Sequence, residues 1–486
     1  MKILHYSLGL PPFRSGGLTK YSVDLMSSQV ANGDEVSLLY PGHYSLNKKL
    51  RISQEKFFKG VGIFEVVNPM FIPLLTGIPS PEVYLKNIDE NIYIDFLKRL
   101  GVGVIHIHTL MGLNKELISA AKKLNIKTIF TSHDYFGICP KVNLIDLKGE
   151  ICSDYNKGKN CIECNINGYS KSLVTLMQSK TYRNLKNSSI LKKLRAYKQM
   201  LIIKKNKNIA NIDNTTKLEN QVEPRKVKEK SNKNNDSLAA GYVNLRKYAI
   251  DILNNIDFIH YNSSVAKDTY EKYIDNENSR ILNITHSNIQ DNRIRKNSNS
   301  NDPLKITYIG SIEKYKGLYF LLDVLEKLLK NNINGWKLNI YGKNVNIDTD
   351  EFKGKVELNG TYDYNELESI FKNTDILIVP SIWYETFGYI ALEAFSYGVP
   401  VIITDLVGFK DMIIPEVTGI VIKADEDELY GKLQTIIKDR KKLSYINRNI
   451  NELLNIYTMG RHTKDVKQLY RKLKTFNEES NPIFNG

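Results

Sequence analysis

The chain has 486 residues, of which 42% are hydrophobic and 25% are charged. This length is too great for one hydrophobic core and favours two or three domains, and the composition excludes a disordered or fibrous protein. Lys and Arg number 68 against 53 Asp and Glu, a formal net charge of +15. Such a charge points to a polyanionic partner, either nucleic acid or an anionic membrane surface.

The chain opens with an apolar stretch of only a few residues that runs into Pro11 and Pro12, so it lacks the apolar core of a signal peptide. No run approaches the roughly 18 apolar residues of a membrane span. Four cysteines in 486 residues fall far below the density of a disulfide scaffold. We therefore expect a cytoplasmic protein, with peripheral attachment to the inner membrane face left open.

Strands alternate with helices along the N-terminal half. Residues 19–31 carry apolar side chains near helical spacing. Apolar runs of strand length occur at residues 2–7, 35–40, 102–108, 127–132 and 257–262. The alternation predicts a mostly parallel, doubly wound α/β sheet.

The same alternation restarts after the polar stretch 297–303. Strands are predicted at 304–310, 337–342, 376–380 and 399–404, and helices at 317–329, 365–373 and 388–397. We expect two Rossmann-like domains facing each other across a crevice, at 1–296 and 297–440. Residues 441–486 are expected to form helices that pack back toward the N-terminal domain.

A long segment interrupts the first domain, from about 137 to 251. Between Asn165 and Ala240 there are 17 Lys and Arg against 5 Asp and Glu, so +12 of the net +15 lies in this part. The basic charge is therefore local, and the two sheet domains are nearly neutral.

The strongest motif lies at residues 380–400, where Glu385 and Glu393 stand eight residues apart on either side of a strand-to-helix turn. Open α/β sheets bind ligands at this edge. Gly388 opens the helix, where unpaired N–H groups and the helix dipole favour a phosphate. Spacing alone leaves a solvated helix face as the alternative.

In context, this stretch resembles the E-x7-E signature of the retaining glycosyltransferases of family 4, the group 1 type with the GT-B fold. Residues 11–17 are similar to the family's N-terminal glycine loop, and residues 309–317 to its donor-phosphate loop. Residues 375–381 match the strand before the glutamate motif, and Gly419 the glycine before the next short strand. The order of the motifs makes the resemblance specific.

The resemblance implies a role for each matching residue. Glu393 would bind the ribose hydroxyls of a nucleoside-diphosphate sugar, and Glu385 the transferred sugar. Lys316 would neutralise the leaving diphosphate. Backbone amides would hold the sugar and diphosphate, at Phe387, Gly388 and Tyr389.

On the N-terminal side, Gly16 and Gly17 would line the acceptor side and approach the same phosphates. The family would also place His133 by the acceptor, and this histidine stands at a predicted strand end. The sequence departs from the family at Ser311, where the family usually has Arg. A bidentate donor is missing there, so phosphate binding rests on Lys316, alone or with Lys314.

The resemblance thus implies a retaining transfer from a nucleoside-diphosphate sugar to a glycan or lipid-linked acceptor in cell-surface polysaccharide synthesis. No metal is required for the chemistry, and Asp348 and Asp350 in a polar loop are interpreted as a chance Asp-x-Asp. Two alternatives stay open: a catalytically impaired glycan- or nucleotide-binding homologue, suggested by Ser311, and a nucleotide-sugar epimerase on the same architecture.

His106 and His108 alternate with isoleucines, so their side chains share one face of a strand. Hydrogen-bonded structural histidines are the favoured interpretation, with an acceptor-site border or a metal pair as alternatives.

All four cysteines lie within 26 residues, at Cys139, Cys152, Cys161 and Cys164. Their clustering in a cytosolic chain suggests a structural zinc site, although the gaps match no standard zinc module and four unrelated thiols remain the alternative.

Residues 189–205 have apolar side chains at helical spacing among lysines and arginines, which predicts a basic amphipathic helix. Such a helix docks on anionic lipid; a solvated helix with a linker is the other interpretation. Nucleic acid is not expected as a partner, because the basic segment lacks interleaved aromatics.

Overall fold

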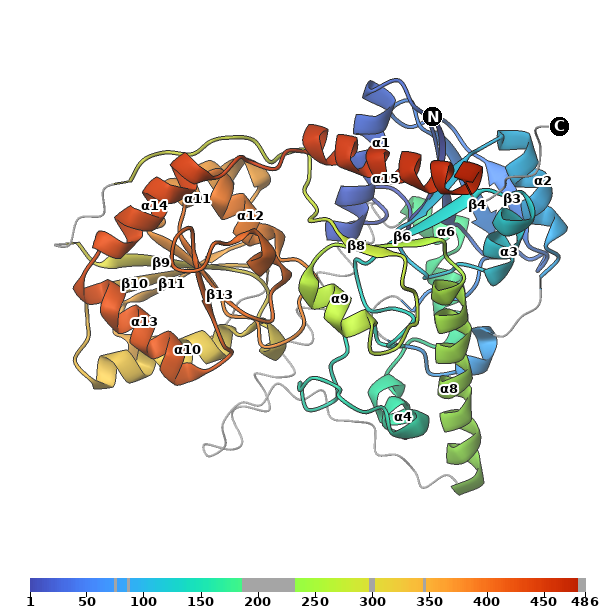
Figure 1. Ribbon diagram of the computed structural model, residues 1–486. Helices are drawn as coiled ribbons and strands as arrows, with labels where there is room; N and C mark the ends of the chain where they lie inside the picture. Colours follow the sequence, from blue (N-terminus) through green and yellow to red (C-terminus); the bar gives the residue numbers. More distant parts are fainter. Residues whose placement is uncertain (74–76, 85–87, 186–231, 297–301, 344–346, 480–486) are drawn as a thin grey trace.

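The protein is described here by a computed structural model that covers residues 1–73, 77–84, 88–185, 232–296, 302–343 and 347–479. It folds into two α/β domains that lie side by side, each built around its own sheet (Figure 1).

The N-terminal sheet has eight strands in the order β3-β4-β2-β1-β5-β6-β7-β8. All neighbours pair in parallel except β3 and β4, which are antiparallel. The strands are β1 (Lys2–Tyr6), β2 (Glu35–Pro41), β3 (Arg51–Gln54), β4 (Gly62–Val67), β5 (Val104–Ile107), β6 (Lys127–Thr131), β7 (Phe258–Tyr261) and β8 (Ser279–Ile281).

The C-terminal sheet has six parallel strands in the order β11-β10-β9-β12-β13-β14. This is the doubly wound order 3-2-1-4-5-6, whose topological switch point lies between its first and fourth strands. The strands are β9 (Leu304–Ile309), β10 (Trp336–Tyr341), β11 (Val356–Gly360), β12 (Ile376–Val379), β13 (Val401–Thr404) and β14 (Ile420–Ile422).

Helices cover both sheets. In the N-terminal domain they are α1 (Gly17–Ala31), α2 (Asn91–Leu100), α3 (Lys115–Lys123), α4 (Lys159–Asn165), α5 (Lys171–Met177), α6 (Lys180–Leu185), α8 (Asn232–Asn254) and α9 (Ser264–Tyr270). The later helices are α10 (Leu318–Lys330), α11 (Leu367–Lys372), α12 (Tyr389–Ser396), α13 (Glu426–Lys438), α14 (Lys441–Leu453) and α15 (Met459–Glu479).

The central strands are buried on both faces, as their continuous apolar sequences require. Every residue of β5, β12 and β13 is buried. Helix α10 illustrates how the helices complete the core, because Leu321, Leu325 and Leu328 recur at helical spacing and are fully buried.

The two C-terminal helices pack against different domains. Helix α14 packs beside α13 and contributes Ile446 and Ile450 to the core of the C-terminal domain. Helix α15 instead crosses to the N-terminal domain and lies along α1 (Figure 1). Lys467 of α15 forms an ion pair with Asp34, with 2.7 Å between Nζ and Oδ1.

The predicted end of the interrupting segment, near residue 251, falls inside helix α8 of the N-terminal domain. Helix α8 connects into β7, and its residues Tyr242, Leu245 and Leu253 are buried in the domain core. The sheet architecture therefore resumes before residue 251. The expected basic helix at 189–205 lies outside the described residues.

No helix among the described residues has the length and apolar content needed to cross a membrane.

Candidate functional site

The loops after β6, β7 and β12 meet between the two domains. The Thr386 hydroxyl donates to the His133 carbonyl oxygen at 3.2 Å, and the Ser263 hydroxyl donates to the Thr386 carbonyl oxygen at 2.6 Å. The hydroxyl of Ser264 donates to Asp411 at 2.5 Å. Because these loops all follow the carboxyl ends of parallel strands, the interface is the edge at which open α/β sheets bind ligands.

Glu385 stands in the loop between β12 and α12. Its Oε1 lies 2.9 Å from Lys316 Nζ, and its Oε2 accepts a hydrogen bond from the Ser381 hydroxyl at 2.5 Å. Lys316 also lies 5.1 Å from the centre of the Trp383 ring. The two charged side chains are 16% and 26% exposed, so the pair is partly shielded from water. An anionic ligand at this point would compete with Glu385 for the ammonium group.

A glycine brings Lys316 to this position. Gly317 follows it with φ of 77°, and a Cβ built there would lie 1.7 Å from the Pro380 carbonyl oxygen. Only glycine permits this approach. The turn that carries Lys316 is thereby held against the end of β12, close to Glu385.

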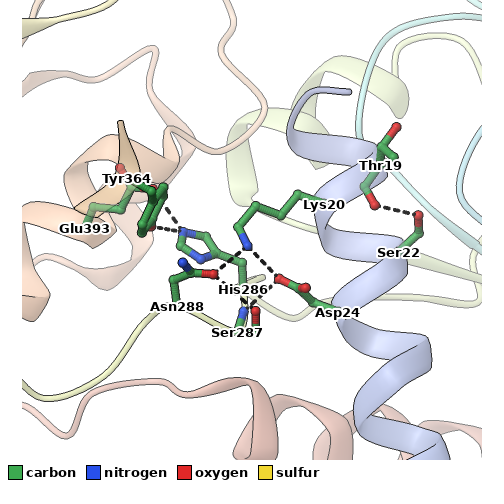
Figure 2. A network of polar contacts seen from close by, with 9 residues as sticks. All are labelled: Thr19, Lys20, Ser22, Asp24, His286, Ser287, Asn288, Tyr364 and Glu393. Carbon is green, nitrogen blue, oxygen red and sulfur yellow. Dashed lines mark hydrogen bonds and ion pairs between the residues drawn. The ribbon is translucent and has the colours of Figure 1, made fainter. Parts of the chain in front are cut away.

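Glu393 lies on α12 and is 7% exposed. Its Oε1 accepts a hydrogen bond from the Tyr364 hydroxyl at 2.7 Å and lies 3.0 Å from His286 Nε2 (Figure 2). Burial and the neighbouring carboxylate raise the pKa of Tyr364 far above its ordinary value, so this phenol stays a donor. Both bonds reach the same oxygen, which leaves Oε2 able to accept hydroxyl groups.

Residues 286–288, which lie between β8 and β9 in the sequence, contact both Glu393 and helix α1 (Figure 2). Beside His286, the Ser287 N–H donates to Asp24 Oδ2 at 2.8 Å. Lys20 donates to Asn288 Oδ1 at 2.7 Å and to Asp24 Oδ2 at 3.0 Å. The carboxylate on α12 and the first helix of the other domain are thus tied to one stretch of chain.

The two glycine-bearing loops approach each other across the interface. Gly17 begins α1, and a Cβ built there would lie 3.2 Å from Tyr389 Cε2 at the start of α12. Gly16 has φ of 108°, and Gly388 has φ of 95° as the residue before α12. Phe387 is buried in the core, so its side chain faces away from any ligand.

Ser311 and Lys314 do not add a second cation beside Glu385. The Ser311 carbonyl oxygen accepts the Tyr308 hydroxyl at 2.6 Å. Lys314 reaches across to Glu150 of the N-terminal domain, with 2.9 Å between Nζ and Oε1. Lys316 therefore supplies the charge next to the glutamate.

His133 lies just beyond β6. Its Nε2 is 3.4 Å from His108 Nδ1, and its ring centre is 4.7 Å from that of Tyr21. Burial lowers the pKa of His133 to about 3, so the ring is neutral at physiological pH. Burial likewise raises the pKa of the adjacent Asp134 to about 7.

His106 and His108 are buried and hydrogen-bonded, as the favoured interpretation of the sequence expected. Within the described part of the chain, His5, His106 and His108 form the one trio whose ligand atoms lie within 4.8 Å of one another. Their nitrogens are taken up by hydrogen bonds to each other and to neighbouring side chains. The three histidines therefore form a hydrogen-bonded network, in which their ring nitrogens already have partners and are not free to bind a metal ion.

All four cysteines line one small cavity, together with Arg246, Tyr155 and Tyr273. The thiols are free, and burial raises the pKa of Cys161 to about 12 and that of Cys164 to about 11. A tetrahedral zinc ion would hold its sulfurs about 3.8 Å apart. No three of these thiols, all described, lie within 4.8 Å of one another. The residue types fit zinc, and the sulfurs would have to move closer to bind it.

His286 and Tyr364, which contact Glu393, belong to no motif and were not predicted from the sequence. His108, which contacts His133, was predicted only as a structural histidine, and its partner His5 on β1 was missed. A histidine in a strand is weak evidence alone. Its alignment with His106 across β1 and β5 was the available signal, once the strand pairing is known.

Comparison with known proteins finds a family match within the C-terminal part of the chain. Residues 290–453 match the family model described as glycosyl transferases group 1. A 41.2 kDa uncharacterized protein in the cps region of Klebsiella pneumoniae is 31% identical over 138 residues, which cover 28% of this chain and 37% of that protein. The Escherichia coli UDP-Gal:alpha-D-GlcNAc-diphosphoundecaprenol alpha-1,3-galactosyltransferase is 23% identical over 175 residues, covering 34% and 44%. The chain thus spans less than half the length of these relatives.

Solved structures resemble the whole chain. Sucrose-phosphate synthase from Thermosynechococcus elongatus superposes with a TM-score of 0.58 at 16% identity, over 98% of this chain and 99% of that one. The Anabaena protein HepE in complex with UDP-glucose gives 0.51 at 11% identity, over 97% and 100%. These likenesses establish the fold, which is GT-B, and they confirm the predicted pair of Rossmann-like domains.

Proposed function

We propose that this chain, whose residues 290–453 belong to the group 1 glycosyl transferases, is a retaining glycosyltransferase. It moves a sugar from a nucleoside-diphosphate sugar to a glycan or lipid-linked acceptor in cell-surface polysaccharide synthesis. The observation that carries the proposal is the pair of anchored glutamates, Glu385 beside Lys316 and Glu393 beside His286, at the edge where the domains meet.

In this proposal the donor lies along the start of α12. Glu393, held through Oε1, binds the ribose hydroxyls with Oε2. The diphosphate takes Lys316 away from Glu385 and is also held by backbone N–H groups from Gly388 onward, where the helix begins. A solved neighbour of the same fold holds UDP-glucose, and the Escherichia coli relative is named for UDP-Gal.

The chemistry asked of the protein is positioning and electrostatic stabilisation. The bond between the anomeric carbon and the diphosphate oxygen breaks while the acceptor hydroxyl attacks from the same face, and its proton passes to the departing diphosphate. Lys316 stabilises the charge that develops on the leaving group. Glu385, released from Lys316, stabilises positive charge at the anomeric carbon.

In this proposal the N-terminal domain forms the acceptor side. The His133 carbonyl and Gly17 lie against the donor loops, and Gly16 precedes Gly17. A surface-glycan acceptor is supported by two relatives, one from a cps region and one that acts on a diphosphoundecaprenol-linked sugar by its name. The basic segment 189–205 suits docking on the anionic inner face of a membrane. The proposed location is therefore cytoplasmic and peripheral.

The test begins with nucleotide sugars screened for thermal stabilisation of the protein, because a ligand that binds only the folded state raises its melting temperature. With the stabilising donor, hydrolysis or transfer is then measured for the wild type, Glu385→Ala and Glu393→Ala. We expect both variants to lose activity while remaining folded. Full activity in both would refute the site, and a product with an inverted anomeric centre would refute retention.

The catalytically impaired homologue is the second candidate, and Ser311 is the observation that favours it. Its side chain is no cation, so Lys316 alone faces the diphosphate. This candidate predicts stabilisation by a nucleotide without hydrolysis or transfer, and Ser311→Arg would then restore activity.

A further inference from the structure

A row of buried polar side chains crosses the N-terminal sheet near the carboxyl ends of four adjacent strands. His5 on β1 pairs in register with His106 on β5, and Thr131 on β6 pairs with His260 on β7. All four side chains are fully buried. Their hydrogen bonds form one continuous series, and its direction can be worked out from one end.

The direction is set at the Leu282 carbonyl oxygen, which can only accept. His260 Nε2 lies 2.6 Å from it and therefore carries the proton, so His260 Nδ1 is a lone pair. The Thr131 hydroxyl, 2.8 Å away, must donate to that nitrogen. Its oxygen then accepts from His106 Nε2 at 2.6 Å.

The series continues through α15. Since His106 is protonated on Nε2, its Nδ1 accepts from the Tyr470 hydroxyl at 2.6 Å. The Tyr470 oxygen accepts from Gln29 Nε2 at 3.2 Å. The Gln29 Oε1 atom then accepts from His5 Nε2 at 2.7 Å.

The final bonds lead to the domain interface. His5 Nδ1, left as a lone pair, accepts from His108 Nε2 at 2.9 Å. His108 Nδ1 accepts in turn from His133 Nε2, in a longer contact of 3.4 Å. His133 Nδ1 is consequently a lone pair, and among the described residues no hydrogen bond engages it.

These bond directions hold only if each ring is neutral, with one N–H. Burial lowers the pKa of His5 and of His260 to about 4. Burial and the neighbouring rings hold the pKa values of His106 and His108 well below their ordinary range. Each histidine in the series therefore carries one proton at neutral pH.

We infer that this series of hydrogen bonds holds His133 in the Nε2–H tautomer and presents its Nδ1 lone pair to a sugar hydroxyl, with Gln29 and Tyr470 as positioning residues. The inference rests on the proposed function for the identity of the ligand. A lone pair accepts from a hydroxyl and repels a phosphate oxygen, so it directs the sugar, rather than the diphosphate, to the His133 side of the site.

The test uses the full-length chain labelled with 15N-histidine. Nitrogen shifts distinguish a protonated from an unprotonated ring nitrogen, and the protein has only 8 histidines to assign. The variant is Tyr470→Phe, which breaks the series four hydrogen bonds away from His133 without changing the packing volume. The matched control is Tyr93→Phe, which removes another buried hydroxyl of the same domain, bonded to Asn114 at 2.7 Å.

We expect the wild type to show a protonated Nε2 and an unprotonated Nδ1 on His133. In Tyr470→Phe the Gln29 amide is free to turn over, and the shifts of His5, His108 and His133 become averages of two tautomers. If half the molecules then hold the wrong tautomer, only the other half can bind the sugar hydroxyl, so KM for the nucleotide sugar rises about twofold whereas kcat stays near that of the wild type. Tyr93→Phe leaves both the shifts and KM unaltered.

A protonated Nδ1 on wild-type His133, or unchanged shifts in Tyr470→Phe, would overturn the inference. An equal rise of KM in both tyrosine variants would also overturn it, because a structural role alone predicts that result. The shifts are measured without substrate, so a wild type with the expected tautomer and no transferase activity would refute the proposed function and leave the tautomer assignment intact.

Discussion

Lys316 and Glu385 form a charge pair whose Nζ and Oε1 atoms are 2.9 Å apart, and the two residues come from loops that follow different strands of the C-terminal sheet. The ammonium group is thereby placed before any donor is bound. It needs only to exchange one anionic partner for another.

The first prediction concerns that ammonium group. Lys316→Ala should lower kcat/KM for transfer by about 10- to 100-fold, because a hydrogen bond to a charged group contributes about 1.5–3 kcal/mol. Steady-state kinetics with the donor found by thermal stabilisation measures the effect. The matched control is Lys314→Ala, since Lys314 pairs with Glu150 instead; equal losses in the two variants would contradict the assignment of Lys316.

The second prediction concerns the support of Glu393. Tyr364→Phe removes the donor to Oε1 and should raise KM for the nucleotide sugar about fivefold, the equivalent of about 1 kcal/mol. The value of kcat should stay near that of the wild type, because the ribose is remote from the reacting carbon. Tyr430→Phe, which alters a hydroxyl bonded to Asn331 on the surface of the same domain, is the control and should change neither constant.

The third prediction is a loss of stability in acid. The folded state holds the pKa values of His5 and His260 at about 4 and that of His133 at about 3, below the ordinary 6.5. Burial also holds the pKa values of His106, His108 and His462 well below that range. The unfolded chain therefore takes up six protons below pH 6.5 that the folded chain does not bind. Asp134 opposes this with one proton, because its folded pKa is raised to about 7 and the folded state binds that proton first.

The net uptake on unfolding approaches five protons between about pH 6 and pH 5, so the free energy of unfolding should fall by up to about 7 kcal/mol per pH unit as the pH drops. Denaturant titrations at pH 6 and pH 5 measure it. In His260→Asn the slope should decrease by about 1.4 kcal/mol per pH unit. A free energy of unfolding independent of pH in this range would show that these rings are not held neutral.

The fourth prediction concerns the cysteine cavity. If the four thiols bind structural zinc, metal analysis of the purified protein should find about one zinc per chain, and Cys161→Ser should lower both the zinc content and the melting temperature. Thiol titration of the metal-free chain should then recover all four cysteines. Protein purified without near-stoichiometric zinc or iron would refute the site, and the cavity would be a packing feature of four unrelated thiols.

Local pattern was enough to predict the alternating elements and the positions of the motif glutamates. Glu385 was expected in a loop after a strand and Glu393 on the next helix, and both lie there. Four strands were missed: β3, β4, β8 and β11. Three of them are runs of three to five residues with exposed positions, which carry little periodicity. The fourth, β4, is a fully buried run of six residues that was overlooked.

The partners of these residues are set by contacts across long stretches of sequence, which periodicity does not encode. His286 and Glu393 are separated by 107 residues, and His106 and Tyr470 by 364. Each pair depends on how the domains are wound and on where α15 docks. The motif glutamates could therefore be predicted from the sequence, whereas the side chains that orient them could not.

The return of α15 to the first domain also bears on how the protein is made. Ribosomes produce β1 through β8 before the C-terminal sheet, and Tyr470 emerges only after both sheets have been synthesised. Until then His106 and Gln29 lack the hydroxyl that joins them, and the face of α1 that α15 covers is open to water. The N-terminal domain should thus reach its final packing only after translation has passed α15, and a fragment ending at residue 296 should be prone to aggregate.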